Sequence, residues 1–301
     1  MKIKLKIFAF VTLLSVLISS CSKDNEKQKV LRFGMIPFES ADKLIEKATP
    51  LMDAIGKGIG MEVKLSVAAD YTGVIEALRG KKLDAAFLTP ASYILAKQEA
   101  NARVILKSQR NGNPYYYGAI ITRSDSGIKT LQDLKGKSFA FGDPISTSGH
   151  VFPRKLLLEN KINPDRDFSH LIYSGAHDAT VLAIMNKKVD AGATYSDDST
   201  GSKGSWTRYL KPEEIKDIRV LAVTDPIPSD NICVSQDMDP KLAEKLAQVI
   251  IDFGKTKEGS ELMQKIYKFT GYIRATDADY DPVRKSFEIA GIKLKDTLHK
   301  K

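Results

Sequence analysis

Short apolar runs alternate with segments of helical apolar spacing along most of the chain. This alternation predicts strands separated by helices, and therefore an α/β fold with largely parallel sheets. The runs with strand character occupy residues 30–35, 62–67, 83–88, 104–108, 117–122, 139–141, 169–173, 189–193, 220–223 and 231–234. Two strongly helical segments, 240–256 and 258–269, follow the last run, and we expect them to pack on the first part of the chain.

Two distant parts of the chain follow one local plan. In each, a polar cap opens a short helix, and a Lys-Lys turn then leads into a strand whose second residue is Asp. These positions are Asp70, Lys81-Lys82 and Asp84 in the first part, and His177-Asp178, Lys187-Lys188 and Asp190 in the second. A plan that recurs only twice indicates a duplicated βαβ-type module rather than a solenoid of short repeats.

The duplication predicts two lobes with a ligand cleft between them. We expect the first lobe to be discontinuous and to contain residues 30–122 and 228–296, and the second lobe to contain residues 123–227. The chain then crosses between the lobes twice, and both crossings would serve as hinges.

Three consecutive hydroxyl residues, Ser146, Thr147 and Ser148, follow the strand at 139–141 and precede an apolar helical segment. At a helix N-terminus the first N–H groups lack partners and the dipole is positive, so hydroxyls there can surround an anion together with the amides. One Ser or Thr suffices for an ordinary N-cap, which stays the alternative. Pro153 requires a helix that either starts late or carries the proline in its first turn.

The first 20 residues resemble a bacterial lipoprotein signal peptide. Three lysines precede an apolar run at residues 7–18, and small residues come directly before Cys21. The run is too short to span a bilayer comfortably, so the pattern predicts cleavage before Cys21 and attachment of a lipid to its thiol. A polar stretch at residues 21–29 would tether the folded domain. We therefore expect a lipid-anchored protein at the outer face of the cytoplasmic membrane or in the periplasm.

The composition is that of a globular protein, and it excludes several functional classes. The formal net charge is +9, but no run of Lys or Arg is interleaved with aromatic residues, so nucleic acid is not an expected partner. Cys233 is the only cysteine besides Cys21, which excludes a disulfide scaffold and a thiolate metal site. The four histidines, His150, His170, His177 and His299, lack the paired spacing of metal ligands, so we expect no metal site. We also expect a monomer that needs no cofactor.

Enzymatic phosphate chemistry has little support in the sequence. Gly136-Lys137-Ser138 resembles the end of a P-loop, but residue 131 is Leu where that motif has Gly, and a strand follows. Ser148 with His150 or His177 is a conceivable nucleophile and base, but it has no obvious oxyanion partner beyond the helix end. We therefore expect a binding protein rather than an enzyme, with a phosphate-handling transferase or hydrolase as the less favoured alternative.

Five segments resemble the phosphate-, phosphite- and phosphonate-binding proteins of ABC importers, in the order and spacing of that family. They lie at residues 69–78, 142–149, 174–179, 189–193 and 226–230, with the sequences ADYTGVIEAL, GDPISTSG, SGAHDA, VDAGA and PIPSD. The resemblance covers essentially the mature chain and implies a two-lobed periplasmic-binding-protein fold of the second type. In such proteins the lobes close on a ligand and deliver it to a membrane permease.

The resemblance also implies which residues hold the ligand, a phosphorus oxyanion or phosphonate. Within the matching segments these residues are Tyr71, Ser146, Thr147, Ser148 and His177, and Tyr116 is added from the aromatic run before the strand at 117–122. Phenol and hydroxyl O–H groups and the imidazole N–H are donors suited to an anion. Two alternatives stay open: Tyr116 packs at a lobe edge as one of three adjacent tyrosines, and His177 caps its helix.

Two acidic positions, Asp197 and Asp230, match family positions that receive the amine of aminoalkylphosphonates. Carboxylates there would attract an ammonium group and repel a bare dianion, so the resemblance implies a preference for an aminated phosphonate. The other interpretation is that Asp197 and Asp198 begin the Ser/Gly-rich loop at residues 199–205, since Asp favours turns. Which of the two faces the cleft is open, because the surrounding sequence departs from the family pattern.

The sequence thus predicts the binding component of an ABC importer, which traps a phosphorus oxyanion or phosphonate by lobe closure. A ligand-sensing lipoprotein of the same fold is the other candidate, because a sensor would have the same cleft.

Overall fold

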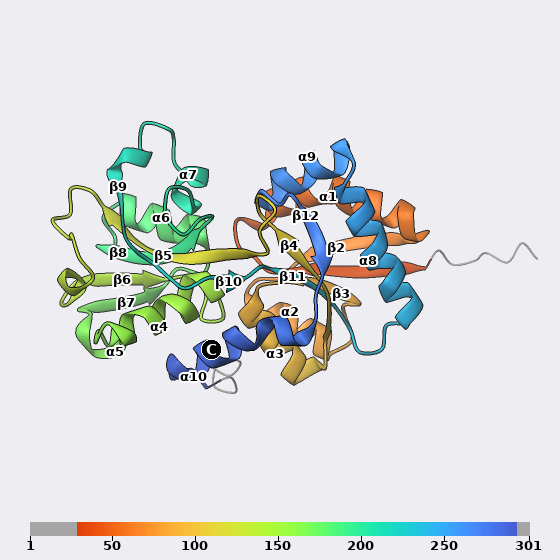
Figure 1. The fold of residues 1–301 in the computed structure, drawn as a ribbon, viewed down its shortest axis with the longest axis horizontal. Coiled ribbons are helices and arrows are strands. Elements are labelled where there is room, and N and C mark those ends of the chain that lie inside the picture. The colour runs from red at the N-terminus through yellow and green to blue at the C-terminus, as the bar shows by residue number, and fades with distance from the viewer. Residues whose placement is uncertain (1–28, 294–301) are drawn as a thin grey trace, which may run out of the picture.

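The computed structural model describes residues 29–293, which fold into two α/β lobes lying side by side (Figure 1). Each lobe is built on one six-stranded sheet, and helices cover both faces of each sheet. The predicted two-lobed α/β fold is confirmed. Within the described range, no helix is both long and apolar enough to cross a bilayer.

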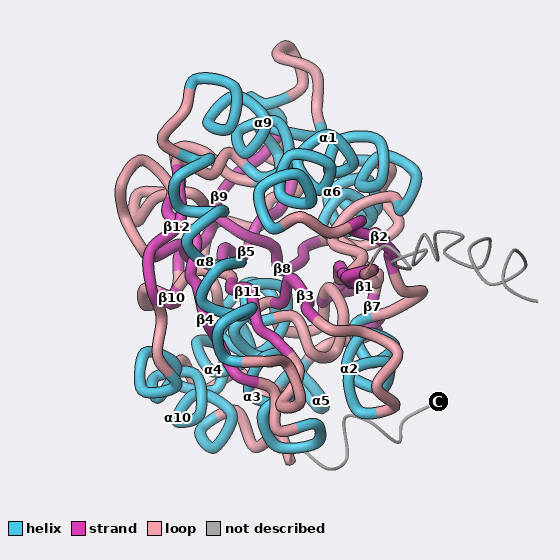
Figure 2. Tube along the Cα trace, turned by 90° about the vertical axis from the view of Figure 1, so that its right-hand side faces the viewer, coloured by secondary structure: helices cyan, strands magenta, loops and turns pink. Residues whose placement is uncertain are grey.

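The sheet of the first lobe has the strand order β12-β4-β11-β3-β1-β2. Its strands are β1 (Val30–Met35), β2 (Glu62–Val67), β3 (Ala85–Leu88), β4 (Arg103–Gln109), β11 (Asn231–Val234) and β12 (Gly271–Arg274). One face carries α1 (Ala41–Ile59), α8 (Pro240–Gly254) and α9 (Lys257–Tyr267), and the other carries α2 (Tyr71–Arg79) and α3 (Pro90–Ala100) (Figure 2). The last helix, α10 (Asp281–Ile289), contacts α3 and also reaches the second lobe (Figure 1). The two C-terminal helical segments thus pack on the first lobe, as the sequence predicts.

The sheet of the second lobe has the order β10-β5-β8-β6-β7, with β9 paired to β5. Its strands are β5 (Tyr115–Arg123), β6 (Ser138–Phe141), β7 (His170–Tyr173), β8 (Ala191–Ser196), β9 (Ile218–Val223) and β10 (Ile227–Pro228). Helices α4 (Phe152–Glu159) and α5 (Pro164–Asp167) lie on one face, and α6 (His177–Met185) and α7 (Ser205–Tyr209) lie on the other.

Both sheets are mixed, so the prediction of largely parallel sheets is wrong. Six of the ten strand pairings are antiparallel. The βαβ units supply the parallel pairs, whereas β5 and β11 enter their sheets from the opposite lobe and therefore run against their neighbours. Because β5 pairs with β8 and β9, the change of sheet comes before Tyr115, earlier than the boundary expected after residue 122.

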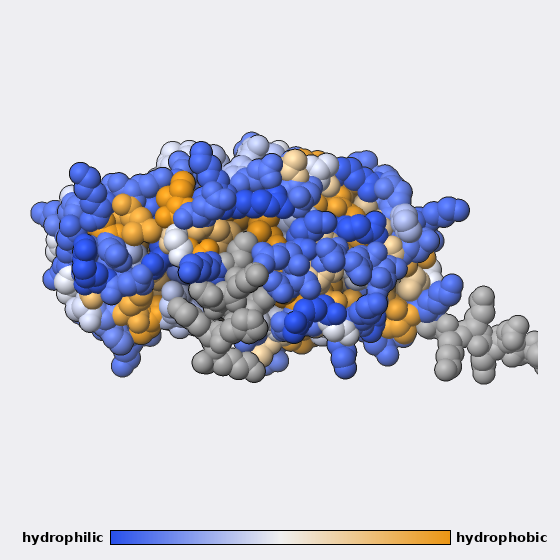
Figure 3. Space-filling model, turned by 90° about the horizontal axis from the view of Figure 1, so that it is seen from below, coloured by the Kyte–Doolittle hydropathy of each residue, from blue (hydrophilic) through white to orange (hydrophobic). Residues whose placement is uncertain are grey.

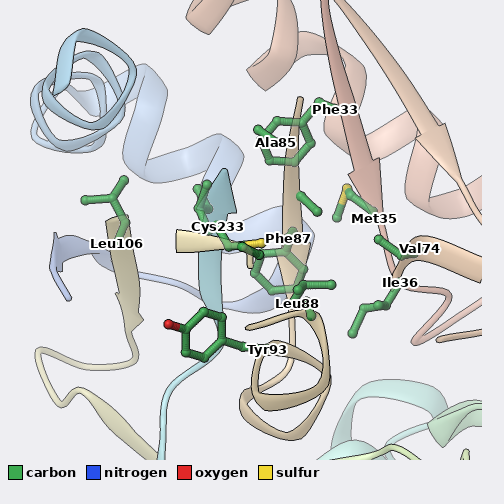
Figure 4. Close-up of a cluster of buried hydrophobic side chains, with 14 of the residues drawn as sticks. Phe33, Met35, Ile36, Val74, Ala85, Phe87, Leu88, Tyr93, Leu106 and Cys233 are labelled. Carbon is green, nitrogen blue, oxygen red and sulfur yellow. The ribbon is translucent and has the colours of Figure 1, made fainter. Parts of the chain in front are cut away.

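The main apolar core fills the first lobe and continues into the second. Phe33 of β1, Phe87 of β3 and Cys233 of β11 lie at its centre (Figure 4). Ile145 and Phe152 of the second lobe belong to the same cluster, so apolar packing bridges the two lobes. On the surface, hydrophilic side chains cover most of the face shown in Figure 3, with apolar side chains between them in small groups.

The duplicated plan is present in the structure at the level of single hydrogen bonds. Asp84 Oδ2 accepts the backbone N–H of Arg32 in β1 at 2.8 Å. In the second lobe, Asp190 Oδ2 accepts the backbone N–H of Ser138 in β6 at 2.9 Å and the Ser138 hydroxyl at 2.7 Å. The preceding turns match as well, because Lys81 and Lys187 have φ values of 54° and 56°. In both lobes an aspartate thus fastens the start of a neighbouring central strand.

Replacing Asp190 by Ala should lower the free energy of unfolding at pH 7 by about 1–3 kcal/mol, because hydrogen bonds to a charged group are lost. Burial raises the pKa of Asp190, but the hydrogen bonds from Ser138 outweigh it and hold the pKa below its ordinary value. The stabilisation is therefore present above pH 4 and fades as the pH falls through the lowered pKa. Urea denaturation at pH 7 and pH 3 measures both effects, and the exposed Glu213→Ala variant is the control. Equal stabilities of the Asp190→Ala variant and the wild type at pH 7 would contradict this role of Asp190.

Candidate ligand site

Four helical N-termini converge where the two lobes meet. The first lobe contributes α2 and α3, and the second contributes α6 and the π-helical turn Thr147–Val151, which runs directly into α4. The backbone N–H of Ala91 in α3 donates to Thr147 Oγ1 across the junction at 2.9 Å. The N–H of His177 approaches the carbonyl of Phe38 at 3.4 Å. Because helix N-termini are electropositive, the junction is suited to an anion.

The three hydroxyl residues are buried at this junction. Ser146 Oγ accepts the N–H of Gly149 at 3.0 Å, so the N-cap interpretation holds for Ser146. Thr147 instead accepts the N–H of Ala91 and joins the two lobes. A hydroxyl that accepts one hydrogen bond keeps its own O–H to donate, so capping and anion binding are compatible.

Pro153 lies in the first turn of α4, and the helix also starts late, after the π-helical turn. The late helix start and the proline in the first turn, which the sequence offers as alternatives, thus occur together. The carbonyl of Gly149, four residues before the proline, accepts a hydrogen bond from the N–H of Gly142 at 2.9 Å. The strand end is thereby fixed against the turn that carries the hydroxyls.

Tyr71 and Tyr116 reach the same interior, and both are buried. Burial raises the pKa of both phenols well above the ordinary value, so both keep their protons. The hydroxyls of Ser148 and Thr147 lie close enough to Tyr116 to oppose this rise in its pKa. Within residues 29–293, Tyr116 Oη has no hydrogen-bond partner. Tyr116 is therefore an interior donor and not a residue at a lobe edge, in contrast to Tyr115, which is 48% exposed.

His177 is a neutral imidazole at physiological pH. Burial, together with the positive charges of Arg110 and Arg208, lowers its pKa to about 3. His177 Nδ1 lies 3.0 Å from Thr194 Oγ1, whose own O–H donates to Ser205 Oγ at 2.7 Å. The network therefore places the imidazole proton on Nδ1 and leaves Nε2 as an acceptor, so this ring differs from the N–H donor that the sequence predicts. The N-cap of α6 is Ala176, and the His177 ring is hydrogen-bonded to Thr194, so the capping interpretation does not fit His177.

Arg110, which the sequence analysis missed, lies buried beside these donors. Its Nη2 forms an ion pair with Asp230 Oδ2 at 2.8 Å, and its Nε lies 4.0 Å from Asp197 Oδ1. The guanidinium carbon is 4.5 Å from the ring centroid of Tyr116. Burial raises the pKa of Asp230, which Arg110 opposes. In the sequence, Arg110 is a single arginine before the Asn-Gly turn at 111–112 and belongs to no recognisable motif. The one signal for a role in the site is its position directly before the first crossing between the lobes.

Asp197 and Asp198 have different roles. Asp198 holds the Ser/Gly-rich loop, because its carboxylate accepts the N–H of Thr200 at 2.9 Å and the N–H and O–H of Ser202 at 3.1 and 2.6 Å. Asp197 instead faces the junction, where its Oδ2 lies 4.0 Å from Lys268 Nζ of the first lobe. The turn-forming interpretation therefore fits Asp198, and Asp197 is the residue that faces the other lobe.

Further contacts hold the lobes together at the mouth of the junction. Arg208 of α7 lies 3.2 Å from Glu39 and donates to the carbonyl of Ile266 at 2.7 Å, both in the first lobe. A pocket of about 300 Å³ opens beside them, lined by Pro37, Glu39, Ser40, Ala69, Asp70, Asp143, Ser174, Gly175, Ala176 and Asp178. Within the described residues, no three His, Cys, Asp or Glu side chains are grouped to hold a metal ion.

The structure brings most of the predicted site residues into one buried junction. The residues gathered there are Tyr71, Tyr116, Ser146, Thr147, Ser148, His177 and Asp230, with Asp197 slightly more exposed at the edge. Cys21 lies outside the described residues. Two α/β lobes closed over buried donors at helix N-termini define a two-lobed ligand-binding protein.

The chain belongs to the family of ABC transporter phosphonate periplasmic substrate-binding proteins, which matches residues 33–280. This result confirms the resemblance noted from the sequence. The chain is 29% identical over 277 residues to the phosphonates-binding periplasmic protein of Escherichia coli, covering 90% of this chain and 80% of the relative. It is 28% identical over 316 residues to the phosphate-import protein PhnD of Mycolicibacterium smegmatis, covering 95% and 96%.

A solved structure supports the fold assignment. PhnD1 from Prochlorococcus marinus, in complex with methylphosphonate, matches with a TM-score of 0.77 and 20% identity, covering 88% of this chain and 99% of that one. The predicted periplasmic-binding-protein fold is thereby confirmed.

Replacing Thr147 by Val should weaken ligand binding by about tenfold or more. Val keeps the shape of Thr but leaves the N–H of Ala91 unpaired and removes an O–H donor from the junction, and about 1.4 kcal/mol corresponds to one decade of affinity. Thr147→Ser keeps the hydroxyl and serves as the matched control. Calorimetric titration with methylphosphonate measures the difference, and equal affinities of the Val variant and the wild type would contradict a role of this hydroxyl in binding.

Proposed function

We propose that the protein captures a small phosphorus oxyanion, such as a phosphonate, phosphite or phosphate, and presents it to the permease of an ABC importer. The observation that carries this proposal is the convergence of four helical N-termini on a buried set of neutral donors. Donors from both lobes would contact one anion, so binding and closure would be coupled. The proposed contacts are Tyr71, Tyr116, Ser146, Thr147, Ser148 and His177.

The names of relatives support this class of ligand. They describe phosphonate binding and phosphate import, and the Prochlorococcus protein holds methylphosphonate. The protonation state of His177 narrows the class of ligand further. Its Nε2 is an acceptor, and would receive a hydrogen bond from the P–OH of a hydrogen phosphate or hydrogen phosphonate. Sulfate carries no such proton at neutral pH, so the site should discriminate against it.

The arrangement of the histidines favours binding over catalysis. His150 Nδ1 donates to the carbonyl of Pro144 at 2.7 Å, and His150 Nε2 lies 3.3 Å from the Tyr173 hydroxyl. His177 Nδ1 is committed to Thr194. The Nδ1 atoms of both imidazoles are thus engaged by groups other than Ser148, which supports binding over catalysis. The choice between importer component and sensor depends on the membrane partner, which co-purification with a permease would identify.

A calorimetric ligand panel tests the proposed function. We expect methylphosphonate, phosphite or phosphate to bind, and sulfate to bind at least tenfold more weakly than the best of them. In His177→Phe the acceptor is lost, so the tightest phosphorus ligand should weaken by about tenfold while sulfate changes little. Exposed His170→Gln is the control. Failure of every phosphorus oxyanion to bind the folded wild type would overturn the proposal.

The membrane anchor is a second part of the proposal. Cys21 follows the signal-like segment and precedes the first strand closely, so a lipid on its thiol would hold the binding domain near a permease. Cys21→Ser should abolish lipid attachment and leave unprocessed precursor in cells. Mass spectrometry of the N-terminal peptide and metabolic labelling with a fatty acid measure processing and lipid attachment, with Cys233→Ser as the control. Lipid-bearing, normally processed protein in the Cys21→Ser variant would contradict the proposed anchor.

A further inference from the structure

Arg110, Asp230 and Asp197 form a buried charge cluster at the site where the chain passes between the lobes. Arg110 directly follows β4 at the first crossing, and Asp230 directly precedes β11 at the second. Asp197 follows β8 in the second lobe. The side chains of Arg110 and Asp230 are each 2% exposed and that of Asp197 is 10% exposed. Three segments distant in sequence thus supply charges to one place that water hardly reaches.

The cluster adjoins the proposed anion contacts. The Arg110 guanidinium stacks over the ring of Tyr116 at 4.5 Å, and the Tyr116 phenol is close to the hydroxyls of Thr147 and Ser148. Arg110 is also close enough to His177 to lower the pKa of that imidazole. A substituent extending from an anion bound among these donors toward Asp230 would therefore meet the guanidinium.

The resemblance to amine-binding relatives rests on Asp197 and Asp230 receiving an ammonium group. Here the guanidinium already pairs with Asp230 at 2.8 Å. Arginine remains protonated at every physiological pH, so its charge is permanent. A ligand ammonium at this position would lose its hydration and face a fixed like charge. The carboxylates that should attract it are already matched, because Asp230 is paired with Arg110 and Asp197 lies 4.0 Å from both Arg110 and Lys268.

We propose that Arg110 is a specificity-determining residue that occupies the place of a ligand amine, so that the site selects phosphorus oxyanions without an ammonium group. This inference rests on the proposed function and reverses the preference that the two aspartates imply in the sequence. An uncharged alkyl substituent is tolerated next to the stacked Arg110 and Tyr116 pair, whereas an aminoalkyl substituent is rejected.

Calorimetric titration with aminomethylphosphonate and ethylphosphonate isolates charge from size, because the two ligands differ by an ammonium in place of a methyl group. We expect the wild type to bind ethylphosphonate at least tenfold more tightly. In Arg110→Met the carboxylate of Asp230 is left unpaired, so the preference should invert to aminomethylphosphonate. Arg110→Lys retains the positive charge and should keep the wild-type preference.

Removal of a buried charge from a pair can prevent folding. The variant Arg110→Met with Asp230→Asn removes both charges of the ion pair, and we expect it to bind the two ligands within about threefold of each other. Methylphosphonate is the reference ligand for all variants. If no phosphorus ligand binds the wild type, the proposed function fails. If methylphosphonate binds but the wild type prefers aminomethylphosphonate, or a folded Arg110→Met variant still rejects it, only the inference about Arg110 is overturned.

Discussion

An anion that is buried in a protein loses its hydration, and each of its oxygens must find new donors. The fold supplies those donors from two sides. The N-termini of α2 and α3 face those of the π-helical turn and α6, and Ala91 reaches Thr147 across the gap at 2.9 Å. Neither lobe presents the whole set. Under the proposed function, a small anion between the lobes would receive donors from both, which fits two sheets whose strand ends face each other across a closed junction.

Contacts away from the anion donors stabilise the same closed arrangement. Arg208 of the second lobe joins Glu39 and Ile266 of the first. On the other side of the junction, α10 packs on α3 of the first lobe and on α4 of the second, where Arg154 Nε donates to the carbonyl of Ala290 at 3.0 Å. Opening has to break both groups of contacts. A ligand that adds its own contacts in the closed state shifts the population toward it by that difference in free energy.

Local pattern was sufficient to predict much of the fold, and it failed where distant segments meet. The strand at 231–234 was located correctly because its apolar run is short and bounded by turn residues, and Ser146 begins a helical turn as predicted. The antiparallel pairings depend on where β5 and β11 re-enter the sheets, which no local signal encodes. Arg110 was missed for the same reason, since its partners lie 87 and 120 positions away along the chain.

The charge balance of the junction bears on how a captured anion would leave. Arg110 is matched by Asp230 at 2.8 Å and by Asp197 at 4.0 Å, and the low pKa of His177 keeps that ring uncharged. An anion would thus be held mainly by neutral O–H and N–H groups, each of modest strength, and its affinity would depend on closure bringing all of them together. An unmatched cation would retain the anion even in the open state. Under the proposed function, internal neutralisation would let lobe separation remove most of the binding contacts at once, as delivery of a ligand to a permease requires.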